Sequence, residues 1–231
     1  MSKIYFHADD FGRSKEISKN IMNCLVNGNL NSVSIIVNHM SSQHHSKLKR
    51  MENINKRLHL NLTEIPKKDL KQNSVLKNIS FIKLIFLKKK EKKIIYQEIE
   101  SQINKYKKIY KPKVFKIDGH EHVHMIPWIL KYLLKIKKKY NIKEFRNSNE
   151  SLIMPNFRDL LNLRYLRNMI ACLIIKVFYN FQGRPKLTKN EFFGIVYSGI
   201  QNERTIIKTL NFFKKKRKKC AEILIHPGFT N

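Results

Sequence analysis

Short apolar runs rich in β-branched residues alternate with amphipathic helical patterns along the whole chain. Such runs predict strands at 4–8, 33–37, 58–62, 114–118, 142–146, 193–197 and 222–225. Helices are predicted at 15–26, 46–53, 73–110, 128–140 and 203–213, with further helix within 156–181. Strands separated by helices pair in parallel, because each crossover returns the chain to the same end of the sheet. The alternation therefore predicts one α/β domain over 1–231 with about seven mainly parallel strands, either open or closed as an incomplete (β/α) barrel.

The charge of the chain is strongly positive, with 47 Lys and Arg against 17 Asp and Glu and a formal net charge of +30. Lysine, isoleucine and asparagine are abundant together, which is typical of A/T-rich codon usage. Arginines that would read bases are few, and aromatic residues do not interleave with the basic ones as in RNA-binding motifs. We therefore predict no specific nucleic-acid partner, although such a field attracts anionic membranes and nucleic acids non-specifically.

The cysteines, the first residues and the longest apolar stretch indicate in which cellular compartment the chain is expected. Cys24, Cys172 and Cys220 are widely spaced and odd in number, which indicates neither a disulfide framework nor a zinc finger. The first residues lead directly into a strand-like run, so no signal peptide is expected and a cytoplasmic location is predicted. The apolar stretch 169–181 contains Lys176 and is too short to span a bilayer.

The densest group of chemically active side chains is the segment Asp-Gly-His-Glu-His-Val-His at 118–124. It follows a predicted strand, and other such residues lie within or after other strands: Asp9, Asp10, His59, Arg146 and His226. The carboxyl ends of parallel strands lie at one edge of a sheet, so these side chains are expected to converge there. Histidines and carboxylates together are typical metal ligands. The sequence therefore predicts a metal-dependent enzyme.

Several of these residues also have simpler interpretations. His122 and His124 share the alternation of His120, so an extended backbone would direct all three to one side. One ion cannot easily take all three, and we expect His122 and His124 to line the pocket or to support the ligands. Asp9 could serve only as an acid at a helix N-terminus. His39, His44 and His45 lie in a polar stretch and are expected at the surface.

Ordered motifs resemble one enzyme family, the YdjC-like carbohydrate deacetylases. The segment His7-Ala8-Asp9-Asp10-Phe11-Gly12 resembles the family's opening Asn-Ala-Asp-Asp-Phe-Gly, with histidine in place of the asparagine. Matching motifs follow at Asn27-Gly28, 31–34, 58–64 (Leu-His-Leu-Asn-Leu-Thr-Glu), 111–112, 118–125, Arg146 and His226-Pro227-Gly228. Relatives commonly continue beyond this last motif with another helical segment, so the resemblance implies a barrel that is incomplete at its C-terminus.

The resemblance implies a barrel-like fold and removal of N-acetyl groups from amino sugars with one divalent metal ion. Carried over by motif, Asp10, His59 and His120 hold the metal and leave positions open for water and substrate. By analogy with metal-dependent polysaccharide deacetylases, Asp9 takes a proton from the attacking water and His226 protonates the leaving amine. Arg146 would bind the acyl group of the substrate, and Asp118 would orient a histidine. Magnesium, zinc, cobalt and manganese all suit these ligands.

Two classes of function remain open at this stage. The first is deacetylation of an N-acetylated amino sugar, a glycan or a lipid-linked sugar. The second is a catalytically weakened, basic peripheral protein that binds a membrane or nucleic acid, for which the cationic amphipathic stretch 164–181 is the best support. The same stretch is also expected as a barrel helix packed on the core. The sequence leaves the oligomeric state open, a dimer included.

Overall fold

The computed structural model describes residues 3–38, 42–64, 79–153, 155–185, 187–188, 190–215 and 220–227. Its centre is a seven-stranded sheet in which every pair of neighbouring strands is parallel. The strands are β1 (Lys3–Phe11), β2 (Ser32–Ile35), β3 (Asn55–Leu60), β4 (Phe115–Gly119), β5 (Ile142–Phe145), β6 (Glu191–Phe193) and β7 (Cys220–Ile225). The predicted α/β class and the parallel pairing are confirmed.

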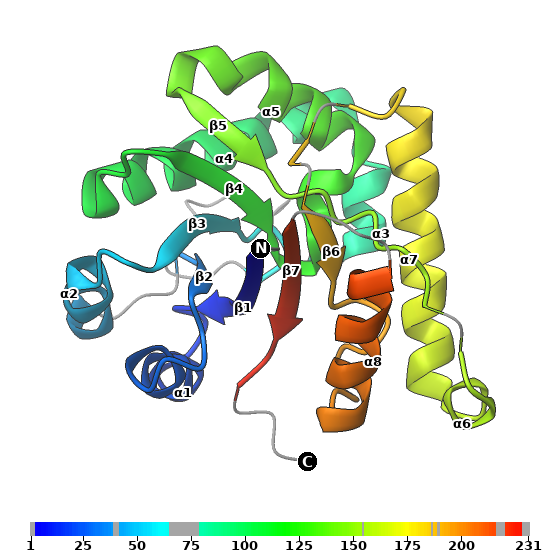
Figure 1. Cartoon of the computed structure of the whole chain (residues 1–231). Coiled ribbons are helices and arrows are strands. Elements are labelled where there is room, and N and C mark those ends of the chain that lie inside the picture. Colours follow the sequence, from blue (N-terminus) through cyan, green and yellow to red (C-terminus); the bar gives the residue numbers. More distant parts are fainter. Residues whose placement is uncertain are drawn as a thin grey trace.

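The strand order is β5-β4-β3-β2-β1-β7-β6. This is the cyclic order of a barrel that is open between β5 and β6, and Figure 1 shows the sheet curling accordingly. Since all strands run the same way, their carboxyl ends lie along one rim of the curled sheet. The barrel-like architecture predicted from the sequence is therefore present in opened form.

Helices cover the outer side of the curled sheet and stand beside its open end (Figure 1). They are α1 (Lys15–Val26), α2 (Ser42–Arg50), α3 (Phe81–Ile85), α4 (Lys89–Tyr110), α5 (Pro127–Tyr140), α6 (Phe157–Leu160), α7 (Leu163–Phe181) and α8 (Glu203–Lys215). The first of them illustrates why they form where they do. The Ser14 side chain accepts a hydrogen bond from the amide of Ile17 at the start of α1, and Gly28 follows its end with a φ of +75°.

The long helix predicted over 73–110 is wrong as a single element. Residues 65–78 lie outside the described part, and from Phe81 onward two helices replace one. Ser80 caps α3, whereas Lys88 has an extended backbone and donates its amide hydrogen to the Glu91 carboxylate at 2.8 Å. A local cap therefore starts a new helix where the periodicity alone predicted continuation.

The strand predicted over 193–197 is also wrong, because β6 ends at Phe193. The amides of Gly194, Ile195 and Val196 donate to one carboxylate oxygen of Glu150, at 3.2, 2.6 and 3.3 Å. These amides point at a single acceptor, so they cannot pair with a neighbouring strand. The apolar residues that suggested a strand instead belong to a turn in the core.

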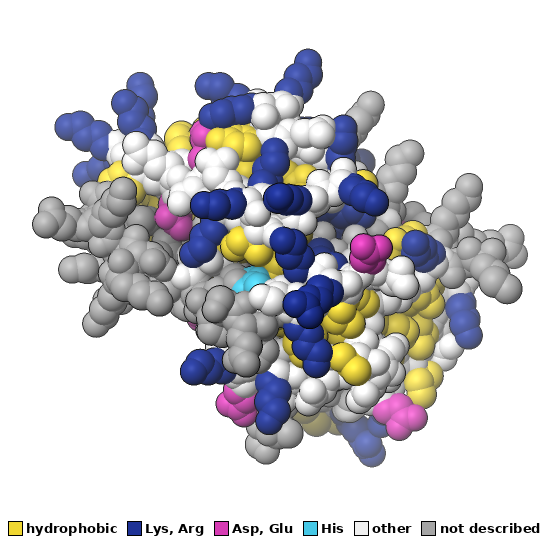
Figure 2. Space-filling view, turned by 90° about the vertical axis from the view of Figure 1, so that its left-hand side faces the viewer, with side chains coloured by type: hydrophobic (Ala, Val, Ile, Leu, Met, Phe, Trp, Pro, Cys, Tyr) yellow, Lys and Arg dark blue, Asp and Glu magenta, His cyan; other side chains and the backbone are white. Residues whose placement is uncertain are grey.

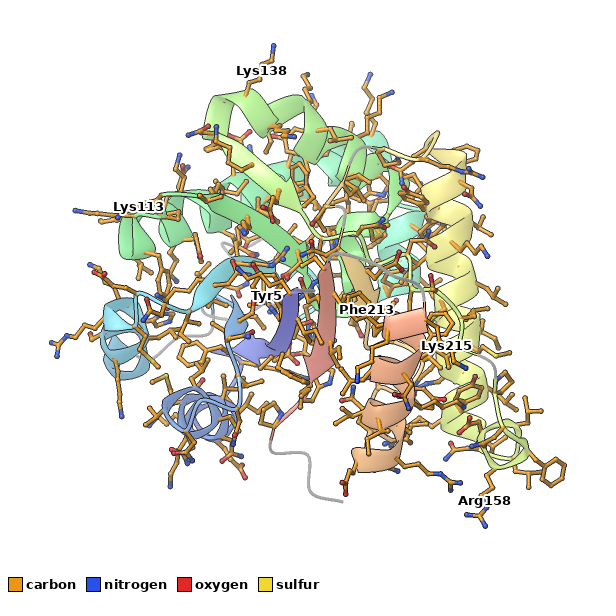
Figure 3. The ribbon with its side chains drawn as sticks, in the orientation of Figure 1. Tyr5, Lys113, Lys138, Arg158, Phe213 and Lys215 are labelled. Atoms are coloured by element: carbon orange, nitrogen blue, oxygen red, sulfur yellow. The ribbon has the colours of Figure 1, made fainter. Side chains whose placement is uncertain are left out.

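The core has two parts. One lies between the sheet and α1, α2, α4 and α5, and the other lies between β6, β7, α7 and α8. Figure 3 shows Phe213 of α8 between that helix and the sheet, whereas Lys113 and Lys138 extend away from the molecule. Figure 2 shows Lys and Arg side chains spread over the described part of one face, with few acidic ones. The positive charge is thus distributed and forms no single stripe on this face.

Candidate active site

Asp9 and Asp10 lie at the carboxyl end of β1, where the pairing with β2 shifts register between Ala8 and Phe11. Side chains of consecutive strand residues normally point to opposite faces. Here Asp10 has a φ of +68°, which is rare for a residue with a side chain, and both carboxylates are buried. The irregularity lets both side chains reach the same group of residues.

Asp10, His59 and His120 meet at the rim of the sheet. One carboxylate oxygen of Asp10 lies 2.8 Å from Nδ1 of His120 and 3.3 Å from Nε2 of His59. Each of these three side chains has one atom that could bind a metal within 4.8 Å of the corresponding atoms of the other two. The three residues predicted as metal ligands from β1, β3 and the end of β4 are therefore brought together.

Asp118 lies behind His59, away from Asp10. Its Oδ1 is 2.7 Å from Nδ1 of His59, so the carboxylate fixes the ring with Nε2 facing Asp10. The other oxygen of Asp118 accepts a hydrogen bond from the Ser34 hydroxyl. A carboxylate–histidine pair of this kind is what orients a metal-binding imidazole.

Arg146 is fully buried and bonded to carboxylates on three strands. Its guanidinium makes two bonds of 2.9 Å to Asp9, one of 2.8 Å to Asp118 and one of 2.7 Å to Glu222. Glu222 in turn accepts a 2.7 Å bond from Arg57, which is buried as well. The guanidinium of Arg146 therefore lies beneath the rim and orients Asp9, so contact with an acyl group remains only a prediction.

The segment after β4 does not have the extended backbone that we assumed for its histidines. Residues His120–Met125 form a 3-10 segment, η3, with φ of +50° at Glu121 and +56° at His122. A Cβ atom at Gly119 would lie 3.1 Å from Nδ1 of His124, so glycine permits this tight turn.

The turn separates His124 from His120. His120 faces Asp10, whereas Nε2 of His124 lies 3.1 Å from the carbonyl oxygen of Arg146. Burial lowers the pKa of His122 to about 3 and that of His124 to about 4. Both rings are therefore neutral at pH 7. The extended backbone that would direct all three histidines to one side is not present here.

A cavity of about 780 Å³ opens over the three-residue group. Asp9, Asp10, His59 and His120 line it together with His122 and His226. Its far wall comes from α7, including Arg167 and Ile174. Burial lowers the pKa of His226, which favours the neutral imidazole at pH 7. The cavity thus brings together the predicted ligands and both predicted proton-transfer residues.

The pKa values of His59 and His120 indicate that the buried carboxylates around them outnumber the permanent positive charges. Burial disfavours charge on His59 and His120, yet neighbouring carboxylates outweigh it and raise their pKa values to about 10 and about 9. Among the described residues here, four buried carboxylates (Asp9, Asp10, Asp118 and Glu222) face two buried guanidiniums (Arg57 and Arg146), which leaves two negative charges. Two protonated histidines or one divalent cation would balance them. Asp10, His59 and His120 therefore fit a divalent cation in both donor type and charge.

Two other groupings of acids and histidines lie close enough to be considered, Asp9-His59-Asp118 and His7-Asp118-Glu222. Their carboxylates are already bonded to Arg146, and Asp118 also to His59. Asp10 instead has one oxygen directed at the two histidines, and Arg13, its guanidinium neighbour among the described residues, lies 3.3 Å from the other oxygen. Of the three groupings, the one that contains Asp10 is therefore the best suited to hold a metal ion.

Comparison with known proteins agrees with this arrangement. The profile of a family described as YdjC-like protein matches residues 3–231, which is nearly the whole chain. The chain belongs to the YdjC-like family. The resemblance found in the ordered motifs is thereby confirmed.

Similar proteins include two animal proteins named carbohydrate deacetylase. The protein of Danio rerio is 27% identical over 152 residues, which cover 61% of this chain and 48% of the relative. The Mus musculus protein is 24% identical over 146 residues, which cover 59% and 47%. This chain thus matches about half the length of these curated relatives. The crystal structure of a "putative cellobiose-phosphate cleavage protein" from Enterococcus faecalis has the same fold, with a TM-score of 0.63 and 17% identity over 100% of this chain and 82% of that one.

Sequence reasoning missed Glu64 and Glu222 as members of this YdjC-like site, and it noted His7 only as a departure from the family's opening motif. Glu64 bonds to Arg13 at 2.6 and 2.8 Å and lies 3.6 Å from His120, and it is the last residue of the motif at 58–64. His7 lies 3.0 Å from Asp9, so the residue that replaces the family's asparagine contacts the predicted base. In the sequence, nothing marks Glu222 as a site residue except that it is an acid within an apolar strand.

One expectation outside the site is wrong. His45 is buried, with its ring against those of Phe11 and Tyr110 and a hydrogen bond to the Tyr110 hydroxyl. His39 and the side chain of His44 lie outside the described residues.

Proposed function

We propose that this chain is a metal-dependent hydrolase that removes the acetyl group from an N-acetylated amino sugar, free or within a glycan. The observation that carries the proposal is the meeting of Asp10, His59 and His120 in one cavity of a YdjC-like chain. The name carbohydrate deacetylase, borne by the relatives, supplies the substrate class.

Asp10, His59 and His120 would hold one divalent cation, such as zinc, magnesium, cobalt or manganese. When bound there, the cation would supply Lewis-acid stabilisation for negative charge that develops at the acetyl carbonyl. Asp118 would keep His59 oriented through its 2.7 Å bond to Nδ1. His122 and His124 would support the site as neutral side chains on the turn after His120.

Asp9 would accept the proton of the attacking water. Burial opposes its ionisation, but the Arg146 guanidinium outweighs this effect and holds the pKa of Asp9 well below its usual range. The carboxylate is therefore ionised and able to accept, and its two bonds to Arg146 set its direction. We accordingly assign Arg146 to positioning Asp9.

His226 would deliver a proton to the amide nitrogen as the bond from carbon to nitrogen breaks. The imidazole lines the same cavity, and its lowered pKa keeps it neutral at pH 7. It must therefore take up a proton before it can donate one, and the proton that Asp9 accepts from the water would supply it within the same cavity. Acetate and the free amine would leave as products.

Acetate release tests this proposal directly. The purified chain would be incubated with N-acetylglucosamine and its short oligomers, with zinc, cobalt, manganese or magnesium in turn. We expect Asp10→Ala and His120→Ala to lower the rate at least about 100-fold, because each removes a ligand. Glu52→Ala, at an exposed acid beyond α2, serves as the control and should leave the rate unchanged. Activity of the two site variants at the wild-type level would contradict the mechanism.

A further inference from the structure

Helix α7 is apolar on two opposite faces. Tyr165, Asn168, Cys172 and Ile175 are its buried residues, and they follow the three- and four-residue spacing of one helical face. On the opposite face an outer stripe of exposed residues runs the full length of the helix, with only one charged member. The outer stripe consists of Leu163, Arg167, Ile170, Ile174, Val177 and Phe181.

The exposure of the outer stripe is large. Leu163 and Phe181 are each 82% exposed and Val177 is 62% exposed. In Figure 1 this helix stands on the right-hand side of the molecule, with α6 at its lower end. Single exposed apolar residues are ordinary, but a row of five along one helix marks an interaction surface.

The outer stripe is continuous with the candidate active site. Arg167, Ile170 and Ile174 belong to the stripe and also line the cavity above Asp10. Ile82 of α3, which is exposed as well, lines the same cavity. A partner that covers the stripe would therefore lie at the mouth of the cavity.

The charge around the outer stripe favours an anionic partner. Helix α7 contains Arg164, Arg167 and Lys176 and no acidic residue. Two copies of this chain meeting through α7 would oppose arginines with no carboxylate from either helix to compensate them. An apolar stripe that contains the basic Arg167, on a helix with no acidic residue, instead suits a lipid surface, where apolar groups enter the interface and cations remain among anionic headgroups.

The helix would lie on such a surface and not cross it. None of the helices in the described ranges combines the length and the apolar character that a membrane span requires. We propose that α7 docks on an anionic lipid bilayer through its outer stripe, so that the cavity opens at the level of the headgroups. Under the proposed function, the sugar would then be one presented at that surface.

Sedimentation with vesicles tests the docking without substrate or metal, so it succeeds or fails independently of deacetylation. The full chain is mixed with vesicles of phosphatidylglycerol and phosphatidylcholine at about 0.1 M and about 0.5 M NaCl, since salt screens purely electrostatic attraction. The test variant is Leu163→Ser/Val177→Ser/Phe181→Ser, which alters three exposed positions and no charge. The control is Val26→Ser/Val114→Ser, at positions 58% and 49% exposed on other elements.

We expect the triple variant to bind at least tenfold more weakly than the wild type at both salt concentrations, and the control to bind within twofold of it. Circular dichroism would verify that both variants are folded. Equal binding of the wild type and the triple variant, lost at the higher salt, would overturn the proposal, because net charge alone would then account for binding. A wild-type dimer that the triple variant converts to a monomer would also overturn it, because a second copy would then cover the stripe.

Discussion

Asp9 and Asp10 are neighbours in β1, yet the carboxylates of both face Nε2 of His59, at 3.9 and 3.3 Å. Their other contacts differ. Asp9 is clamped by two bonds to Arg146, whereas Asp10 has an oxygen 2.8 Å from His120. Two identical side chains are thus given different chemistry by one irregularity in the strand.

This difference predicts that the two aspartates can be separated by substitution. We expect Asp10→Asn to lower the affinity for zinc at least about 100-fold, because a charged ligand is lost. Asp9→Asn should lower zinc affinity by no more than about tenfold while acetate release falls at least about 100-fold. Calorimetric titration with zinc and an acetate assay measure the two effects. Equal losses of zinc affinity would mean that both carboxylates bind the ion.

Metal binding should release protons. Carboxylates raise the pKa of His59 to about 10 and that of His120 to about 9, so both rings carry a proton at pH 7.5 without metal. A metal ligand must be neutral imidazole, and roughly two protons should therefore leave for each ion bound. Affinity should accordingly rise with pH up to about 10, where His59 has also lost its proton. Calorimetry in buffers with different ionisation enthalpies measures the proton count, and a heat independent of the buffer would contradict the prediction.

The sequence predicted the convergence of Asp10, His59 and His120 because that convergence depends on topology alone. Alternating strands and helices imply a parallel sheet, and a parallel sheet brings strand ends to one rim. The family motifs then selected these three from the other acids and histidines. The side on which Asp9 lies could not be predicted, because it depends on the positive φ of Asp10.

The buried ionic network was beyond prediction for a different reason. Arg57 and Glu222 come from β3 and β7, and each looks like an ordinary polar residue within a strand. Arg146, at the end of β5, was predicted to bind the substrate and not to pair with buried carboxylates. Their pairing follows from the curl of the sheet, which brings distant strands together. Likewise, nothing in the apolar run at 193–197 reveals that Glu150 takes three of its amides.

The network makes Arg146 a large contributor to stability. Removing one partner of a buried ion pair leaves uncompensated charge, which costs about 3–5 kcal/mol. We therefore expect Arg146→Met to lower the free energy of unfolding by roughly that amount, because three carboxylates lose their partner. Arg13→Met removes a guanidinium that is 29% exposed, and it should cost about 1 kcal/mol or less. Urea denaturation measures both, and similar losses for the two variants would contradict this view of the network.

Glu150 should make stability depend on pH. Burial outweighs its three amide hydrogen bonds and raises its pKa from 4.5 to about 7, so folding favours the protonated form. Its contribution is then fully present below pH 4.5 and is lost as the pH rises through about 7.

Glu150→Gln keeps an oxygen that can accept the amides of Gly194, Ile195 and Val196 but cannot ionise. The difference in unfolding free energy between wild type and Glu150→Gln should therefore shift in favour of the variant from pH 5 to pH 8. Glu150→Ala leaves the amides without an acceptor and should be less stable than Glu150→Gln by roughly 2–4 kcal/mol throughout this range, because neither variant ionises at this position. Urea denaturation of the three proteins across this pH range measures the difference. A difference between wild type and Glu150→Gln that is constant with pH would show that Glu150 does not titrate there.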